Sequence, residues 1–239
     1  VHVASNPEFL REGTALLDFM EPDRIVVGAQ SDSVSQKVLQ LYSKIMSPKI
    51  ATSIESAELT KYAANSYLAM RLTFANDIAE LSARSGANVD DVLSAMGLDK
   101  RIGPSFLKPG PGWGGSCFPK DTKALVSVAD EFGVDLPLVS ATVRSNEAAF
   151  VRVAESISEL CGGAPKGKTI AVWGLSFKAG TDDTRDSPAL EIIQILIAEG
   201  ATVRVFDPVA SAPPLPGLVQ LPSAIDAAQG ADALAVLTE

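Results

Sequence analysis

The alternation of short apolar runs with amphipathic helical stretches in the last third of the chain most strongly constrains its fold. Strands are predicted at residues 168–175, 202–206 and 233–237, and helices at 188–199 and 224–229. Parallel strands need a crossover connection, usually a helix, and this alternation supplies helices between the strands. The pattern therefore predicts an α/β class domain, doubly wound around a parallel sheet, that begins after the Gly/Pro segment 162–165.

The first two thirds of the chain have a different character. Residues 33–161 have helical periodicity, with long helices expected over 54–85 and 138–160. Residues 1–29 follow a strand–helix–strand pattern, which is too short for a domain and which we interpret as the end of an α/β domain. We therefore expect three parts: an N-terminal remnant (1–30), a central all-helical domain (31–161) and the C-terminal domain (162–239). The sequence lacks an initiator methionine, and we expect it to be a piece of a longer protein.

Charge and cysteine content exclude several classes of function. The net charge is −9 without a long basic run, so generic binding to nucleic acid or to an anionic membrane is not expected. No apolar run approaches the roughly 20 residues of a membrane span. The two cysteines, Cys117 and Cys161, suit a reducing cytoplasm and predict neither a disulfide framework nor a metal site. Because His2 is the single histidine, a Ser-His-Asp or Cys-His mechanism within the chain is not expected.

Residues 114–121, Gly-Gly-Ser-Cys-Phe-Pro-Lys-Asp, are the strongest indication of chemistry in the sequence. Cys117 ends a glycine-rich loop and precedes an apolar helical pattern, so its thiol is expected near the positive end of a helix dipole, which favours thiolate. Asp121 follows four residues later, at the spacing that brings two side chains to one helical face. A nucleophilic thiol with a nearby proton acceptor predicts covalent catalysis.

Two further segments carry acids or amides at helical spacing. Glu8 and Glu12 follow a strand and could share one helical face, where they would order water and substrate, or they could simply be acids placed in a first helical turn. Lys61 and Asn65 could hydrogen-bond a developing oxyanion, or they could form a surface pair with Glu58 and a capped amide. The spacing alone favours the structural alternative in both cases.

Two loops combine glycine with charged residues. Residues 110–115 contain a literal G-x-G-x-x-G, but prolines interrupt it and no predicted strand precedes it, so we interpret it as a ligand-wrapping loop and not as a dinucleotide fingerprint. The alternative is a simple linker. Residues 174–188 follow a strand, and their lysine and arginine suit an anion at a helix N-terminus. The alternative there is a charged surface turn with Ser187 as the N-cap and Pro188 as the first helical residue.

Taken in order, the four segments 6–13, 58–67, 108–121 and 174–188 resemble the nucleotide-sugar 6-dehydrogenase family, and the likeness spans nearly the whole chain. The resemblance implies an NAD-binding Rossmann domain, a central helical dimerisation domain and a UDP-sugar-binding domain. It also implies a four-electron oxidation with NAD as cofactor, in which the sugar alcohol becomes an aldehyde, a cysteine-bound thiohemiacetal, a thioester and finally a uronic acid. The family's NAD fingerprint is not in this sequence, so NAD binding is inferred for the parent protein.

The same resemblance implies roles for individual residues. Cys117 is the nucleophile, and Asp121 activates or orders water. Lys61 and Asn65 hold the reacting oxygen, whereas Glu12 handles water and contacts substrate or cofactor. Lys120 and Arg185 are expected, with Glu12, on the cofactor side. The residues expected to bind the UDP-sugar are Glu8, Phe9, Leu10, Arg101, Phe106, Lys108, Gly110, Gly112, Gly114, Phe177 and Lys178. Arg101 matches a family arginine that reaches the neighbouring subunit's site, so a homodimer built on helix 54–85 is expected.

UDP-glucose is the expected substrate. Ser116 and residues 118–121 argue against the branches that act on UDP-N-acetyl-hexosamines, and residues 62–67 and 101–103 favour UDP-glucose. The GDP-mannose branch shares the Gly-Gly-Ser-Cys and Phe-Lys-Ala-Gly-Thr-Asp-Asp runs and remains the alternative. A reading of another class is a non-catalytic module that dimerises and binds a nucleotide sugar without producing NADH. The 239 residues alone are expected to be inactive.

Overall fold

The computed structural model describes residues 1–238. The chain forms two compact units, Val1–Tyr67 and Leu68–Glu239, which are described separately below. No helix among the described residues is both long enough and apolar enough to cross a membrane.

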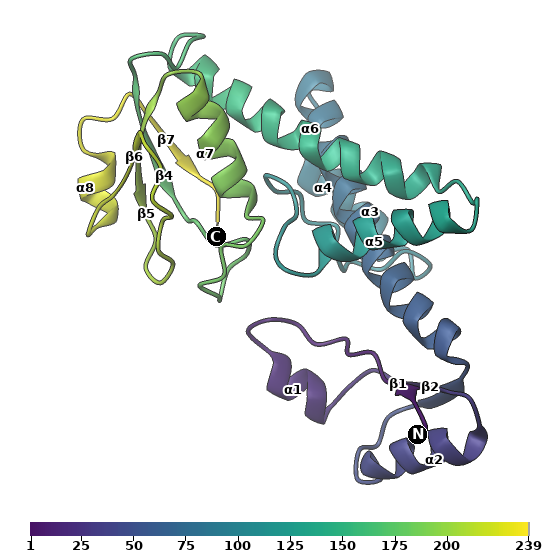
Figure 1. Cartoon of the computed structure of the whole chain (residues 1–239). Helices are drawn as coiled ribbons and strands as arrows, with labels where there is room; N and C mark the ends of the chain where they lie inside the picture. The colour runs from purple at the N-terminus through teal and green to yellow at the C-terminus, as the bar shows by residue number, and fades with distance from the viewer. Residues whose placement is uncertain (239) are drawn as a thin grey trace. The chain divides into compact units, whose positions relative to one another are not determined.

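The N-terminal unit contains a three-stranded sheet in the order β1-β2-β3, with β1 (Ala4–Ser5), β2 (Ile25–Ala29) and β3 (Lys49–Thr52). β1 is antiparallel to β2, whereas β2 and β3 are parallel and are joined by α2 (Asp32–Leu41), which is visible beside β2 in Figure 1. The core of this sheet is small and is centred on three buried side chains, Ile25, Val27 and Leu39.

Three details of the N-terminal unit differ from the sequence-based expectation. The first strand covers only Ala4–Ser5, and α1 is a short helix, Ala15–Met20, without a buried residue. β3 lies in a stretch that we expected to be helical, and it completes a parallel pair with β2. Its residues are mostly exposed, so they give no apolar periodicity that would reveal a strand.

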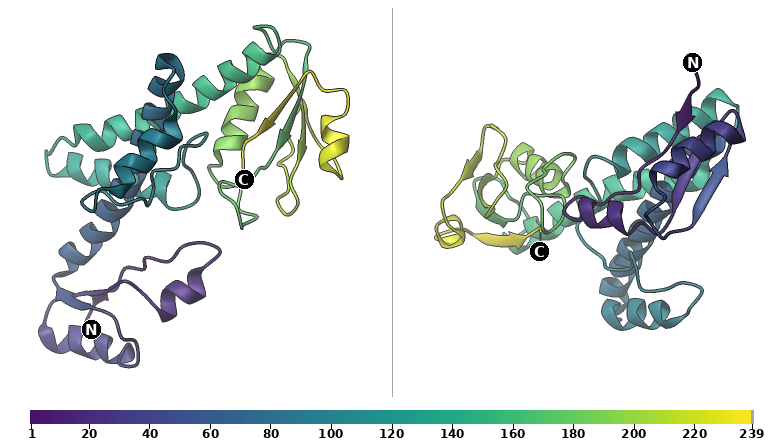
Figure 2. Two further views of the ribbon diagram at one scale, coloured as in Figure 1. Left: turned by 180° about the vertical axis from the view of Figure 1, so that it is seen from behind. Right: turned by 90° about the horizontal axis from the view of Figure 1, so that it is seen from below.

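The helical region agrees closely with the prediction. α3 covers Ile54–Ser85 and is followed by Gly86 at φ +77°, a conformation that glycine adopts without steric cost. α4 (Val89–Leu98) begins after Asn88, whose side chain accepts a hydrogen bond from the Asp90 amide at 2.9 Å. α5 (Phe118–Glu131) and α6 (Pro137–Leu160) form an antiparallel pair, seen from two sides in Figures 1 and 2.

The C-terminal sheet confirms the predicted doubly wound topology. Its strands are β4 (Thr169–Trp173), β5 (Thr202–Phe206), β6 (Leu218–Gln220) and β7 (Ala233–Val236), in the order β6-β5-β4-β7 and all parallel. α7 (Pro188–Ala198) covers one face and α8 (Ala224–Ala228) covers the other (Figure 1). The three-residue strand β6 was not predicted, because it is too short to produce a strand pattern.

The burial of β4 and β5 explains why both strands are recognisable in the sequence. Ile170, Val172, Val203 and Val205 are fully buried, and α7 adds the buried side chains of Ile192, Ile193 and Leu196. β4 is buried on both faces, because Ala171 between Ile170 and Val172 is also fully buried, and its sequence is a nearly continuous apolar run. β5 instead alternates its buried valines with the partly exposed Arg204, which is the pattern of a strand with one fully buried face.

Candidate active site

Cys117 lies at the N-cap of α5, where the glycine-rich loop meets the helix. Its thiol is half-buried and free of any disulfide, and its Sγ lies 3.7 Å from the Ser116 Oγ. Pro119 occupies the first turn of α5, where its missing N–H leaves no hydrogen bond unmade. The structure therefore confirms the expected position of the thiol at the start of a helix.

Asp121 lies one turn into α5 and is fully buried. Its amide donates a hydrogen bond to the Cys117 carbonyl oxygen at 2.8 Å, and its carboxylate is paired with the Lys120 ammonium group. The Lys120 side chain is two-thirds exposed, so the buried Asp121 carboxylate is paired with a cation that lies at the protein surface. A buried acid in the first turn of a helix is stabilised both by this lysine and by the helix dipole.

The loop that leads to Cys117 is held by the helices around it. The Gly110 amide donates to the Asn76 Oδ1 at 2.8 Å, and the Trp113 indole donates to the Thr73 Oγ1 at 2.8 Å. The Asn146 side chain accepts from the Trp113 amide and donates to the Trp113 carbonyl oxygen, both at 2.9 Å. Sequence reasoning missed these anchoring residues.

The glycines of this loop stand at positions of close approach. A Cβ at Gly114 would lie 1.9 Å from the Asp186 carbonyl oxygen, and a Cβ at Gly115 would lie 2.7 Å from the Phe177 ring. The Gly115 amide also donates to the Arg185 carbonyl oxygen at 3.0 Å. These contacts explain why glycine is required at positions 114 and 115: any side chain there would clash with residues 177–186. The ligand-binding role of this loop stays a prediction.

The loop after β4, residues 174–187, lies at the point where the strand order of the C-terminal sheet reverses. The chain runs from β4 to β5 and β6 on one side and then returns to β7 on the other side of β4. Ligands of doubly wound sheets bind outside the carboxyl ends of strands at such a switch point. Phe177 and Lys178 are on this loop, with the Lys178 Nζ 5.5 Å from the centre of the Phe177 ring.

The end of this loop is capped as the sequence predicts. The Ser187 Oγ accepts from the Ala189 amide, and Pro188 is in the first turn of α7. The Arg185 guanidinium is paired with Asp183, with 2.7 Å between the Nη2 and Oδ2 atoms. Both the cap and the anion-binding interpretation of this loop are compatible with this geometry.

Asp207, at the end of β5, organises the same loop and was not singled out from the sequence. Its buried carboxylate accepts hydrogen bonds from the amides of Leu175, Ser176, Val209 and Ala210. Burial alone would raise the pKa of Asp207, but these amide hydrogen bonds outweigh it and lower the pKa below its ordinary value. An acid after the second strand of a Rossmann-like unit, followed by Pro208, is the signal that could have found it.

Arg101 and Phe106 flank a turn at Ile102 and Gly103, which hydrogen bonds from α3 hold in place. Arg101 is highly exposed, and its guanidinium pairs with Asp99, with 2.6 Å between Nη2 and Oδ2. Arg71, from α3, donates to the carbonyl oxygens of Ile102 and Gly103, each at 2.8 Å. Phe106 has a φ of +59°, which is uncommon for a bulky residue and is a form of backbone strain that often accompanies function. The neighbouring Lys108 is exposed.

A second group of predicted residues lies in the N-terminal unit. Lys61 is on α3, and its Nζ lies 2.9 Å from the Glu8 Oε1. Asn65, one turn later on the same helix, is buried. The Phe9 ring has the Arg24 guanidinium 3.8 Å from its centre and the Lys61 Nζ at 5.7 Å. The structure thus brings Lys61, Glu8 and Phe9 together, at a sequence separation that spacing could not reveal.

The expectation that Glu8 and Glu12 share a helical face is wrong, because α1 begins only at Ala15. The Glu8 carboxylate accepts from the Leu10 amide at 2.7 Å, and the Arg11 amide and guanidinium bind the Asp18 carboxylate. The Arg11 guanidinium holds the pKa of Asp18 well below its usual range. These side-chain hydrogen bonds satisfy the backbone of a turn in place of a helix.

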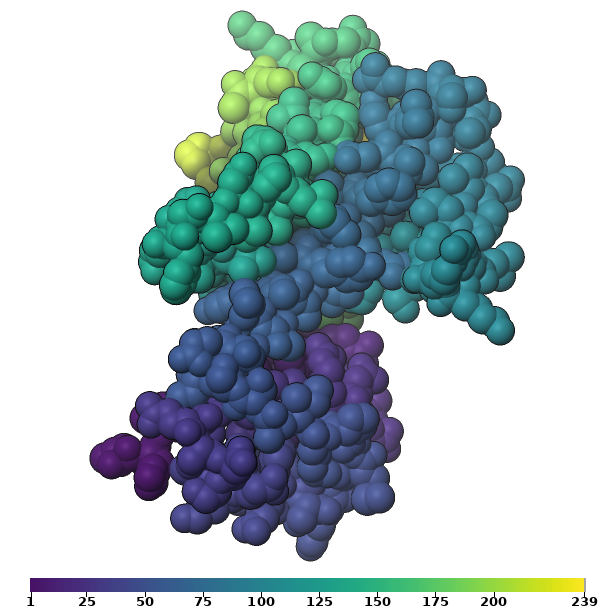
Figure 3. Space-filling view, turned by 90° about the vertical axis from the view of Figure 1, so that its right-hand side faces the viewer, coloured from purple at the N-terminus to yellow at the C-terminus, as the bar shows by residue number. Residues whose placement is uncertain are grey.

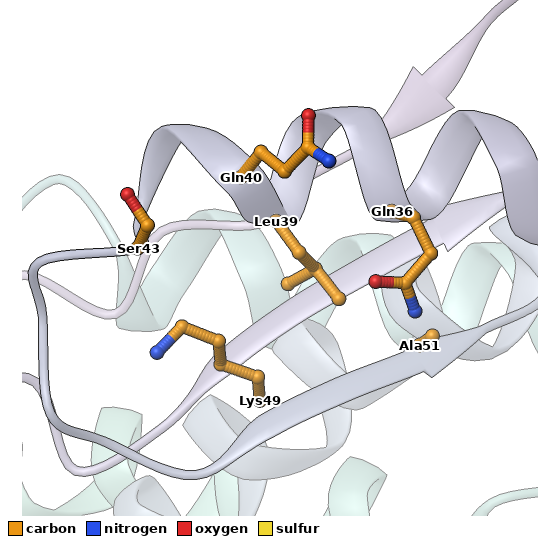
Figure 4. A pocket seen from close by; sticks show the side chains of 6 residues that line it. All are labelled: Gln36, Leu39, Gln40, Ser43, Lys49 and Ala51. Carbon is orange, nitrogen blue, oxygen red and sulfur yellow. The ribbon is translucent and has the colours of Figure 1, made fainter.

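A hollow of about 450 Å³ lies between α2 and β3 and contains none of the predicted site residues. It is lined by Gln36, Leu39, Gln40, Ser43, Lys49 and Ala51, and Figure 4 shows these side chains. The Lys49 Nζ already donates to the Ile45 carbonyl oxygen. Within residues 1–238, no group of three or more His, Cys, Asp or Glu side chains could hold a metal ion.

Comparison with known protein families identifies the family to which the chain belongs. Three models of the UDP-glucose/GDP-mannose dehydrogenase family match it: the NAD binding domain over residues 1–46, the central domain over 55–148 and the UDP binding domain over 171–239. The chain belongs to the UDP-glucose/GDP-mannose dehydrogenase family. The resemblance seen in the sequence is thereby confirmed, whereas the boundaries 1–30, 31–161 and 162–239 stay predictions.

Individual relatives agree with this family. The UDP-glucose 6-dehydrogenase of Rhizobium meliloti is 45% identical over 247 residues, and that of Rickettsia conorii is 41% identical over 244 residues. Each alignment covers 100% of this chain and 56% of the relative, so the chain spans little more than half the length of these proteins.

Solved structures give the same result. A UDP-glucose dehydrogenase from Pyrobaculum islandicum matches with a TM-score of 0.95 and 38% identity, covering 99% of this chain and 56% of that one. A UDP-D-ManNAc dehydrogenase from Pyrococcus horikoshii matches with a TM-score of 0.86 and 28% identity, covering 99% of this chain and 55% of that one.

Proposed function

We propose that the full-length protein is an NAD-dependent UDP-glucose 6-dehydrogenase that oxidises UDP-glucose to UDP-glucuronate. The observation that carries the proposal is the half-buried Cys117 thiol at the start of α5, with the buried Asp121 carboxylate one turn away. The relatives of Rhizobium meliloti and Rickettsia conorii, named as UDP-glucose 6-dehydrogenases, support the choice of substrate.

Cys117 is assigned the covalent part of the reaction. Its sulfur attacks the aldehyde carbon formed by the first oxidation, an S–C bond forms, and the carbonyl oxygen takes up a proton to give a thiohemiacetal. The thiohemiacetal hydroxyl then loses its proton to solvent while a second hydride leaves this carbon for NAD, which yields a thioester. Water then attacks the thioester carbon, the S–C bond breaks, and the thiolate leaves with the uronic acid as product. Holding the aldehyde on sulfur keeps it oriented between the two oxidations.

Lys61 and Asn65 are assigned to the reacting oxygen, which bears negative charge when the alcohol is deprotonated and when the thiohemiacetal forms. An ammonium group and an amide N–H are both donors suited to such an oxyanion. Asp121 is proposed to activate or order the hydrolytic water. Glu12 is proposed to bind this water and to contact the substrate or the cofactor. The Lys61–Glu8 pair supports the role of Lys61, because the carboxylate holds the lysine side chain in place.

NAD is proposed as the hydride acceptor of the full-length protein. The residues described here do not make a complete site for it, because residues 1–46 contain no glycine-rich turn between a strand and a helix that could hold a pyrophosphate. Lys120, Arg185 and Glu12 are proposed as contacts on the cofactor side. The two hydride transfers are accordingly assigned to the protein with a complete NAD-binding domain.

The nucleotide sugar is proposed to bind at the switch point of the C-terminal sheet. Phe177 and Lys178 lie on the loop after β4, where an aromatic ring and a cation suit a base and a phosphate. Phe106, Lys108, Gly110, Gly112 and Gly114 are proposed to surround the sugar from the loop before Cys117. Glu8, Phe9 and Leu10 complete the proposed substrate contacts.

A homodimer through α3 is part of the proposal. Leu59, Tyr67, Phe74 and Leu81 follow one another at seven or eight residues, so they lie on one face of the helix, and each is about half exposed. Figure 3 shows the surface of α3 in blue. The exposed Arg101 suits a residue that reaches the substrate of a second subunit. A cytoplasmic location is proposed because the mechanism needs a reduced Cys117.

The stoichiometry of NADH tests the proposal. Full-length protein is incubated with NAD and UDP-glucose, and in parallel with GDP-mannose, and the NADH formed per sugar consumed is measured. Two NADH per UDP-glucose are expected. Two NADH with GDP-mannose alone would change the substrate, and no NADH with either sugar, together with retained sugar binding, would establish the non-catalytic module.

Replacing the nucleophile tests the covalent step. Cys117→Ser is expected to reduce uronate formation by about 10³-fold or more, because a serine hydroxyl is a much weaker nucleophile than a cysteine thiolate. UDP-glucose binding should remain within about threefold of the wild type, and Cys161→Ser is the matched control with normal activity. Full uronate yield from Cys117→Ser would exclude the thioester route.

A further inference from the structure

Asn146, on α6, holds the loop before Cys117 by two hydrogen bonds to its backbone. It is buried, and its amide group bonds both polar backbone atoms of Trp113: the Oδ1 accepts from the amide nitrogen, and the Nδ2 donates to the carbonyl oxygen, each at 2.9 Å. A buried loop residue cannot satisfy its backbone by secondary structure, and here one side chain supplies both partners.

Trp113, four residues before Cys117, is held in place by several contacts. It is itself buried, its indole donates to the Thr73 Oγ1, and its ring packs edge-on against Phe118 with 6.3 Å between centroids. Phe118 is the residue directly after the nucleophile. The residues on both sides of Cys117 are therefore tied to one tryptophan, and Asn146 holds its backbone.

The glycines leave the segment between these points little freedom. A Cβ at Gly112 would lie 2.4 Å from the Phe150 ring, one turn beyond Asn146 on α6, and Gly114 and Gly115 are pressed against Asp186 and Phe177. Residues 112–115 thus follow a narrow path between α6 and the loop after β4. Small shifts of Trp113 must be passed on to the thiol, because close-packed segments do not absorb displacement locally.

We propose that Asn146 is a positioning residue that sets the place and exposure of the Cys117 thiol through Trp113. It touches no reacting atom in this scheme. The effect on turnover rests on the proposed dehydrogenase function, whereas the effect on thiol exposure does not.

The test compares Asn146→Ala with Ser145→Ala in full-length protein that also carries Cys161→Ser, so that Cys117 is the single cysteine of this region. Ser145 is the adjacent residue on α6, and its hydroxyl bonds Asp77 and not the loop. Three quantities are measured: the rate of Cys117 alkylation by iodoacetamide, kcat and KM for UDP-glucose, and the Kd for UDP.

Asn146→Ala is expected to raise the alkylation rate several-fold, because the loop opens more often, and to lower kcat roughly 10- to 100-fold, the cost of misplacing a reacting group by about 1 Å. The Kd for UDP should stay within twofold, and Ser145→Ala should resemble the parent in all three quantities. Unchanged alkylation and kcat in Asn146→Ala would overturn the proposal.

Two milder variants keep the test decisive if Asn146→Ala does not fold. Asn146→Asp keeps an acceptor for the Trp113 amide but loses the donor, and Thr73→Val removes the partner of the indole. Each should give the same two changes at smaller size, and normal values in both would overturn the proposal. If Asn146→Ala alters the alkylation rate but the parent protein does not oxidise UDP-glucose, the positioning role of Asn146 stands and the proposed dehydrogenase function is wrong.

Discussion

The N-terminal sheet and the C-terminal sheet have similar local architecture but very different cores. Both contain a parallel strand pair joined by a helix, yet the first core rests on Ile25, Val27 and Leu39, and α1 has no buried residue. The second core joins strands, α7 and part of α6 around a dozen buried side chains. Local pattern therefore specifies strands and helices in both regions, but among the described residues the C-terminal sheet has the larger buried apolar core and should gain more stability from it.

The largest effect in this comparison is expected from the centre of the C-terminal core. Ile192→Ala, a fully buried position on α7, should reduce the free energy of unfolding of this region by about 2–5 kcal/mol, through lost burial and a residual cavity. Hydrogen exchange of the β4 and α7 amides in full-length protein measures the loss. A loss below about 1 kcal/mol would mean that this core does not control the stability of the sheet.

A smaller effect is expected at Asp207, the buried carboxylate that follows the C-terminal end of β5 in the same sheet. Asp207→Asn should cost about 2–3 kcal/mol at neutral pH, because an amide offers one acceptor oxygen where the carboxylate offers two to the four backbone amides. The same exchange measurement applies, with Asp226→Asn, a substitution at an exposed residue of α8, as the matched control.

The pH dependence of this variant follows from the lowered pKa of Asp207. A carboxyl with a lower pKa in the folded state than in the unfolded state contributes stability above about pH 4, and this stability is lost as the pH falls through the folded value. The wild type should lose part of its stability below pH 4, and Asp207→Asn should lack that part. Equal acid sensitivity in both proteins would contradict the assignment.

The smallest effect is expected in the N-terminal unit. Leu16→Ala on α1 should change stability by less than about 0.5 kcal/mol, because the Leu16 side chain is 78% exposed and loses little burial. Amide exchange of β2 before and after the substitution measures it. A loss above about 1 kcal/mol would show that the apolar side chains of α1 are covered in the protein, and the contrast between the two sheets would then be smaller than the described structure indicates.

Several parts of the fold could be predicted because neighbouring residues define them. The limits of α3, the cap at Ser187 and Pro188, and the start of α5 after Cys117 all depend on contacts within one or two turns. The strands β4, β5 and β7 were also found, since their apolar runs are dense. By contrast, β3 and β6 are short and largely exposed, and their place in a sheet depends on partners far along the chain.

The candidate site divides in the same way. Cys117 and Asp121 were singled out from residue type and spacing, whereas Lys61 and Asn65 were assigned a site role only through the family resemblance, and these roles stay predictions. The hydrogen bonds of Asn146, Asp207 and Arg71 were not recognisable, because nothing local distinguishes these residues from other polar side chains. The structure places Asn146 with Thr142 and Ala149 on the buried face of α6, where an amide needs a partner, and this burial was not recognised from the sequence.

The sequence by itself determined the family, the doubly wound C-terminal domain, the long central helix and the position of a free thiol at a helix start. Each of these depends on periodicity, caps or short motifs, which are local properties of the chain. Tertiary structure alone decided that Lys61 pairs with Glu8, that Asn146 holds Trp113 and that Gly114 and Gly115 meet the loop after β4. Those contacts join residues 33 to 72 positions apart, and their energies exist only once packing has brought the partners together.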